Sequence, residues 1–401
     1  MTDTKFSITS TQAGTILNRL PLVLLLGFVA SLQVSIALAG ILLTATLLCW
    51  LITLVQERKL PTAPAFFIPL VAYAGITLLS CAFSTDPLAS LSDSRELLLF
   101  LIVPAVYQIV RSKREAITVI DVIISVGAVS ATFGIIQYAV LHYDNLGQRP
   151  QGALTHYMTY SGLIMLVLCA AVARLMFGKK GRTWPALVLP ALAVALAVTF
   201  TRSAWIGAIA GVSVLLVLRN LRLLAILPVG IILVFMLTPN DINQRMRSIF
   251  DLTDPTNRDR LAMVYTGTAM ITDYPLTGVG PDMVERLYPT YRDPRGVNMI
   301  NQHLHNVPLQ IAAERGLPAL GIWLWFLILL TSDLIKRVRQ SDLQSLASSG
   351  LAAIAAMLFA GLFEYNFGDS EFLMLFLVLV TLPFAAQTSS GEREHGPAQP
   401  L

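Results

Sequence analysis

The sequence predicts an all-α polytopic membrane protein with about 12 transmembrane helices, on three observations. Mean hydropathy is +0.68 and only 13% of the residues are charged, whereas about a quarter are charged in soluble domains. Apolar runs of roughly 20 residues recur along the chain, each long enough to cross about 30 Å of hydrocarbon as a helix. These runs are continuously apolar and lack the two-residue alternation of β-barrel strands.

The apolar runs define one integral membrane domain over residues 1–387. Only a short polar break at residues 31–33 separates the first two runs. We expect residues 388–401 to form a disordered cytoplasmic tail, because they are polar and terminal. The expected spans are 15–32, 35–55, 64–83, 97–110, 117–140, 159–176, 185–200, 203–218, 223–238, 307–330, 347–365 and 371–387.

The distribution of the lysines indicates how these spans are oriented in the membrane. All six lie at the N-terminus or in every second loop, and the positive-inside rule assigns those regions to the cytoplasm, with both termini inside. The net charge of +4 mostly reflects such anchors beside the membrane lipids, so it does not indicate a nucleic-acid partner. The outward loops are then 84–95, 142–157, 201–202, 239–306 and 366–370.

One outward loop, residues 239–306, is large and rich in arginine. It contains no lysine and closes on the sequence His303-Leu304-His305-Asn306. Arginine can grip phosphate oxygens with two parallel hydrogen bonds, and histidine titrates near neutral pH. This composition indicates chemistry on a phosphorylated lipid rather than a plain transport path. The arginines are Arg245, Arg247, Arg258, Arg260, Arg286, Arg292 and Arg295.

Arg202 and Arg149 are candidate phosphate ligands outside this large loop. Arg202 lies between two apolar runs, near the start of the span at 203–218. It could reach the outer head groups, but a helix N-terminus also favours an anion at that place, and we favour a phosphate ligand. Arg149, in the loop 142–157, fits an anion contact and an ordinary loop charge equally well.

Arg258 and Arg260 are two further candidate ligands for a diphosphate. A helix with one apolar face is expected from Arg260 to Ile271. The alternative is that both arginines pair with Asp254 and Asp259 on a solvated surface. That alternative is weaker for Arg260, which opens the expected helix.

His303 and His305 are candidate general bases, since they stand where the loop re-enters the membrane. An imidazole can take the proton of an attacking sugar hydroxyl, which accelerates such reactions by about 10²–10⁴-fold. Two histidines spaced by two residues need not both face the substrate, so the choice between them stays open. We expect at least one of the two histidines to act as the general base.

No metal or other cofactor is expected. The outward loops contain no Asp-x-Asp pair to hold a divalent ion, and a His-x-His sequence without nearby carboxylates or thiols is a poor metal site. The arginines would then have to neutralise a departing diphosphate. Electrostatic stabilisation of that kind is often the largest catalytic contribution.

Three short motifs in this order resemble the O-antigen ligase and polymerase superfamily, over roughly residues 120–380. They are Thr201-Arg202-Ser203, then Arg260 with Pro275-Leu276-Thr277-Gly278-Val279-Gly280, then His305-Asn306 with Leu309-Gln310, Glu314 and Gly316-Leu317. The resemblance implies a glycosyltransferase fold of the GT-C type in the bacterial inner membrane, with one large periplasmic loop. It also implies metal-independent, inverting transfer of O-antigen from undecaprenyl diphosphate to lipid A–core oligosaccharide in the periplasm.

The resemblance assigns roles to residues. Arg202 and Arg260 match the family's diphosphate-binding arginines, and the histidine of the His-Asn motif matches the base that activates the acceptor hydroxyl. Position before Asn306 favours His305, although His303 could share or replace the role. Lipopolysaccharide ligation is the leading hypothesis, because only one outward loop is large.

Three other functions compete. An O-antigen polymerase would use the same donor with a glycan acceptor, and a protein O-oligosaccharyltransferase would act on pilin hydroxyls. A lipid-linked glycan transporter would place charged residues midway through several spans. This chain instead keeps its charges at the outer surface, with few charged residues midway through a span.

Overall fold

The computed structural model describes residues 19–237, 240–249 and 251–391. Within these ranges the chain is helical and contains no β-strand, only one isolated bridge between Asn145 and Gln148. After a first helix at Arg19–Ser31 come α2 (Ile36–Glu57), α3 (Phe67–Ala82), α4 (Pro87–Asp93), η1 (Ser94–Leu101), α5 (Ile102–Ile109), α6 (Lys113–Ala139), α7 (Tyr157–Phe177), α8 (Thr183–Ala197), α9 (Arg202–Arg219), η2 (Leu221–Ala225), α10 (Ile226–Leu237), α11 (Asn240–Arg247), α12 (Pro255–Asp273), α13 (Val284–Tyr291), α14 (Val307–Val338), α15 (Gln344–Ala360), η3 (Asn366–Gly368) and α16 (Ser370–Gly391).

Every apolar run is largely helical where it is described, which fits an all-α membrane protein. Among the described residues, five helices are long and apolar enough to cross a membrane: α2, α6, α7, α9 and α14. Other apolar helices are shorter, and the expected span 97–110 is divided between the 3₁₀ helix η1 and the short α5. The count of 12 spans and the GT-C fold therefore stay predictions. The helix α16 continues to Gly391, so residues 388–391 of the expected tail are helical, and the rest lies outside the described residues.

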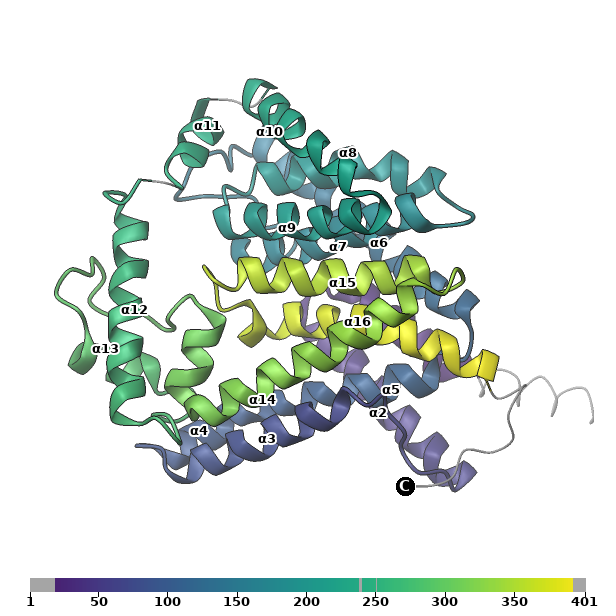
Figure 1. Ribbon diagram of the computed structural model, residues 1–401, viewed down its shortest axis with the longest axis horizontal. Helices are drawn as coiled ribbons and strands as arrows, with labels where there is room; N and C mark the ends of the chain where they lie inside the picture. The colour runs from purple at the N-terminus through teal and green to yellow at the C-terminus, as the bar shows by residue number, and fades with distance from the viewer. Residues whose placement is uncertain (1–18, 238–239, 250, 392–401) are drawn as a thin grey trace, which may run out of the picture.

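The helix α7 stands at the centre of the bundle, where it packs against α6, α8, α9, α15 and α16. Figure 1 shows these helices side by side, with α12 lying across one end of the bundle. The helices α9 and α15 are in close contact because Gly207 and Gly211, one turn apart on α9, face α15. A Cβ on Gly207 would lie 2.7 Å from a carbonyl oxygen of α15, and a Cβ on Gly211 would lie 2.9 Å from another. Small residues at this spacing let membrane helices approach each other.

The large loop folds into helices of its own, α11, α12 and α13, and the expected helix 260–271 lies inside α12. Asp254 caps α12 by accepting hydrogen bonds from the backbone N–H groups of Thr256 and Asn257. The buried residues of α12 recur every three or four positions, so one face is buried. On that face Met263 and Met270 join a small apolar core with Leu304, which fixes α12 beside the start of α14.

The helix α14 is broken at Gly316, whose backbone is in the left-handed region at φ 82°. Residues 275–280, which precede α13, pack against the break and form backbone hydrogen bonds with it. Val279 and Gly280 donate backbone hydrogen bonds of 2.8 and 2.9 Å to the carbonyls of Ala313 and Glu314, and Leu317 donates one to the carbonyl of Pro275. The break therefore leaves these backbone groups paired, as the interior of a membrane protein requires.

Replacing Gly316 with alanine should strongly destabilise the protein. A Cβ at this position would collide with the backbone of Leu276 and Thr277, and an alanine would also be strained at this φ. The matched control is Gly321→Ala in the same helix, where the Cβ would meet nothing within 4 Å. Thermal unfolding of the purified variants should show a large loss for the first and none for the second. Equal melting temperatures would contradict the strained break.

Candidate active site

The turn that starts α14 positions the two loop histidines. Asn306 caps the helix by accepting a 2.9 Å hydrogen bond from the backbone of Leu309. His305, just before it, has φ 47°, an uncommon conformation for a residue other than glycine. Val307 donates a 2.7 Å backbone hydrogen bond to the carbonyl of Gly361, which ties this turn to the end of α15. Strained backbone of this kind persists only where its surroundings hold it, and it often marks functional sites.

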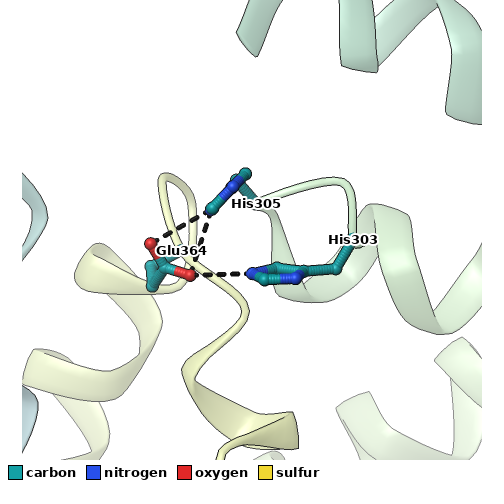
Figure 2. Close-up of side chains that lie close together, drawn as sticks. All are labelled: His303, His305 and Glu364. Carbon is teal, nitrogen blue, oxygen red and sulfur yellow. Dashed lines mark hydrogen bonds and ion pairs between the residues drawn. The ribbon is translucent and has the colours of Figure 1, made fainter. Parts of the chain in front are cut away.

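Glu364, in the loop after α15, binds both histidines (Figure 2). Its Oε1 atom lies 3.1 Å from His303 Nε2, and both carboxylate oxygens lie 3.1 Å from His305 Nδ1. The two imidazole rings are 4.2 Å apart between centroids. Burial acts to raise the pKa of Glu364, but the charges and hydrogen bonds of His305 and His303 outweigh it and lower that pKa. The carboxylate is therefore ionised and accepts from both rings.

This arrangement leaves a different nitrogen open on each histidine. An ionised carboxylate only accepts hydrogen bonds, so His305 donates from Nδ1 and keeps its Nε2 lone pair available. His303 uses Nε2 toward Glu364, which leaves Nδ1, the ring nitrogen beside its own main chain. A carboxylate in this position fixes the tautomer and the orientation of the ring. His305 is thus the better placed base of the two, because its open nitrogen is the one remote from its own main chain.

Arg202 is held at the first position of α9 and is only 4% exposed. It follows Thr201, the residue before the helix, and Phe200, whose φ is 55°. Its guanidinium donates to the carbonyl oxygen of Ser248 at 2.7 Å and to the Asp254 carboxylate at 3.3 Å. The side chain therefore points under the large loop instead of reaching toward head groups.

Three further arginines lie near Arg202. Arg245 contacts the second carboxylate oxygen of Asp254 at 3.6 Å, and burial together with the charges of Arg202 and Arg149 lowers the pKa of Arg245 to about 10. Burial also lowers the pKa of Arg260, where the charge of Arg202 adds to the shift and Glu364 opposes it. We call these four residues, Arg149, Arg202, Arg245 and Arg260, the arginine cluster.

The arginine cluster has more positive charge than its surroundings neutralise. Asp254 is the carboxylate that forms ion pairs with it among the described residues, and it contacts two of the four guanidinium groups. The Nε atom of Arg260 is buried without a hydrogen-bond partner. Buried positive charges that repel one another favour an anionic ligand, because it restores the missing partners.

Two cavities flank the histidine pair. The Arg260 cavity, of about 180 Å³, is lined by Arg260, His305, Thr256 and Asn298, among others. The Asp369 cavity, of about 240 Å³, is lined by residues that include His303, Glu364 and Asp369. Both cavities also contact Met158 at the start of α7. The imidazoles thus stand between two cavities: one is lined by Arg260 together with Asp259, and the other is lined by two carboxylates and, among the described residues, by no arginine.

The structure brings most of the sequence-predicted site residues together: His303 and His305 meet at Glu364, and Arg149, Arg202 and Arg260 belong to the arginine cluster. Arg258 does not join them. It is exposed, lines neither cavity, and donates a 3.5 Å hydrogen bond to the carbonyl of Arg295.

Among the described residues, neither Arg258 nor Arg260 forms an ion pair with Asp254 or Asp259, the alternative that the sequence left open. Asp259 instead accepts hydrogen bonds from Val297, Asn298 and Asn301. Asp254 forms ion pairs with Arg202 and Arg245.

Sequence reasoning missed Glu364, Arg245 and Asp254 as parts of the site. Glu364 falls at the end of the expected span 347–365. An acidic residue that closes an apolar run is the signal that could have identified it as a candidate site residue. Arg245 and Asp254 belong to the large loop but to no motif, and only the folded loop brings them to Arg202.

The premise that no carboxylate lies near the His-x-His pair is wrong, because Glu364 supplies one. One ligand atom from each of His303, His305 and Glu364 lies within 4.8 Å of the others, so these residues could hold a divalent ion. Two imidazoles and one carboxylate are a usual donor set for zinc. The hydrogen bonds to Glu364 explain the same arrangement without an ion, and metal independence stays a prediction.

Part of the chain is similar to a known protein family. Residues 188–324 match the family model for O-antigen ligase, a segment that contains Arg202, Arg260 and both histidines but ends before Glu364. A search of curated proteins found no match. With its apolar helices, the chain is a multi-pass membrane protein, and its segment 188–324 is similar to the O-antigen ligase family.

Proposed function

We propose that this protein transfers O-antigen glycan from undecaprenyl diphosphate to lipid A–core oligosaccharide, on the periplasmic face of the inner membrane. One observation carries the proposal: the Arg260 cavity contains both a guanidinium of the arginine cluster and His305, whose orientation Glu364 fixes. A leaving diphosphate and an activated hydroxyl can therefore meet in one place. The family supports a glycosyltransferase that acts on lipid-linked glycan.

The reaction assigned to these groups is a single displacement. The acceptor hydroxyl gives its proton to His305 Nε2 while its oxygen forms a bond to the anomeric carbon of the donor sugar. The bond from that carbon to the diphosphate oxygen breaks, and its electron pair leaves with the undecaprenyl diphosphate. Attack opposite the leaving group inverts the anomeric centre. Glu364 stabilises the imidazolium that forms, and the arginine cluster stabilises the charge on the leaving group.

Reconstitution tests the function directly. The purified protein in lipid nanodiscs would receive an undecaprenyl-diphosphate glycan, with lipid A–core, free glycan and pilin offered as separate acceptors. Ligation predicts product on lipid A–core. Product on free glycan alone would identify a polymerase, and product on pilin alone a protein glycosyltransferase. Absence of any product would contradict glycosyl transfer from this donor.

The same assay tests metal independence. Transfer should stay unchanged after the protein is treated with EDTA, because arginines replace a metal ion as the partners of the diphosphate. The control is the treated protein with Mg²⁺ or Zn²⁺ restored. Activity lost in EDTA and regained with either ion would contradict metal independence and would make His303, His305 and Glu364 the candidate ligands.

A further inference from the structure

The Asp369 cavity has no role in the proposed handling of the diphosphate. It lies between the start of α7, the start of α9 and the loop from Glu364 to Asp369. Met165 and Phe372 are among the apolar residues that line it. Its volume of about 240 Å³ gives room for a single sugar ring, and His303 forms part of its wall.

The charges of this cavity are opposite to those of the arginine cluster. Glu364 and Asp369 line it, whereas no arginine or lysine does so among the residues that the structure describes. The only other ionisable groups in its wall, within those same residues, are His156, His303 and Tyr365. A diphosphate or a phosphorylated sugar would meet like charge here, which disfavours binding.

The carboxylate of Asp369 in this cavity accepts hydrogen bonds. Asp369 caps α16 through a 2.9 Å bond from the backbone of Phe372 and accepts a 2.5 Å bond from the Thr159 hydroxyl. Each carboxylate oxygen can still accept a second hydrogen bond. The Asp369 side chain is therefore fixed in place before a ligand arrives, with acceptor capacity to spare.

Asn366 gives an independent indication that a ligand belongs here. It is only 6% exposed, lines the same cavity, and donates a hydrogen bond to the carbonyl of Met357. Its Oδ1 atom is buried without a partner. A buried acceptor without a donor is costly, so this oxygen favours a ligand that brings a hydroxyl or amino group.

We propose that the Asp369 cavity is the subsite for the acceptor sugar, and that it takes a ring with free hydroxyl or amino groups and no phosphate. This inference rests on the proposed function: the acceptor ring occupies the Asp369 cavity beside His303, and its attacking hydroxyl extends past the histidine pair to His305 at the Arg260 cavity. The two cavities then divide the substrates by charge. The donor diphosphate belongs to the arginine side, and the hydroxyl-bearing acceptor belongs to the carboxylate side.

Photolabelling tests the subsite without any glycan transfer. The protein in nanodiscs would be labelled with a diazirine derivative of methyl glucoside, and the labelled peptides mapped by mass spectrometry. Label should appear within residues 156–165 or 364–372. Methyl glucoside and methyl glucosaminide should displace it at concentrations about tenfold lower than methyl glucoside 6-phosphate does, because the phosphate meets two carboxylates. Label elsewhere, no label, or equal displacement by the phosphorylated sugar would overturn the proposal.

Variants sharpen the test. Asp369→Asn keeps a side chain that caps helices equally well but removes the charge, so discrimination against the 6-phosphate should shrink. Asn366→Ala deletes the unpaired oxygen without touching the cap of α16 and should weaken labelling. Asp144→Asn, an exposed loop position, is the matched control and should behave as the wild type. Unchanged discrimination in Asp369→Asn would contradict the role of its charge.

Kinetics link the subsite to the reaction. In the reconstituted assay, Asp369→Asn should raise KM for lipid A–core about tenfold while KM for the donor stays unchanged, since only acceptor binding is affected. An equal rise in both values would contradict an acceptor subsite. If the wild type binds the photolabel as expected but transfers no glycan, the proposed function fails while the cavity's preference for uncharged sugars stands.

Discussion

Replacing His305 with asparagine should lower the rate of glycan transfer by about 10²–10⁴-fold, the usual contribution of a general base. Its Nδ1 lies 3.1 Å from both oxygens of Glu364, which leaves Nε2 for the acceptor hydroxyl. Asparagine is chosen because it tolerates the positive φ of this position better than alanine does. The measurement is the rate constant for transfer to lipid A–core under saturating donor and acceptor.

His142→Asn is the matched control, since His142 is exposed, also has positive φ and lines neither cavity. It should transfer at the wild-type rate. His303→Asn should have a milder effect, because that ring uses Nε2 toward Glu364. If His303→Asn lowered the transfer rate severely and His305→Asn only mildly, His303 would be the base. If neither variant lowered the rate, the general-base mechanism would be wrong.

Replacing Arg260 with alanine should reduce transfer by about 10²–10³-fold, comparable to the loss of one donor that stabilises charge in a transition state. Arg260 lines the same cavity as His305, and its Nε atom is buried without a partner, so a diphosphate oxygen can complete its hydrogen bonding. Rates at saturating donor and KM for the donor should both be measured. A loss confined to KM would mean that Arg260 binds the diphosphate equally well before and during the reaction.

Arg258→Ala provides the control for Arg260 within the same helix. Arg258 carries the same charge two residues earlier but is exposed and lines neither cavity. Its removal should leave transfer near the wild-type rate. Equal losses in the two variants would show that the loop's overall charge, and not the arginine cluster, governs the reaction.

Local sequence pattern predicted the parts of the fold that depend on neighbouring residues. Long apolar runs indicated the helices, and the apolar face of residues 260–271 indicated α12. Pattern alone did not show the break at Gly316, because that kink depends on backbone hydrogen bonds from residues 275–280, which are remote from it in sequence.

The same contrast holds for the site. His305, Arg202 and Arg260 could be chosen because residue type and position at a membrane edge restrict their roles. Glu364 could not be paired with His305 from sequence, since 59 residues separate them and a whole helix pair intervenes. Sequence pattern favoured Arg260 over Arg258 because Arg260 was expected to open the helix, but α12 begins at Pro255, and it is the direction of each side chain on α12 that distinguishes them.

The Asp254 carboxylate both pairs with the arginine cluster and caps α12, which affects how substrate can exchange. Its Oδ1 atom accepts from Arg202 and also from the backbone of Thr256 and Asn257 at the start of α12. An incoming diphosphate that claims Arg202 and Arg245 would displace Asp254 as their counterion, yet the carboxylate would keep its bonds to the helix. Asp254 can therefore act as the counterion of these arginines when no substrate is bound. When substrate displaces it, its negative charge is still stabilised by the hydrogen bonds to α12.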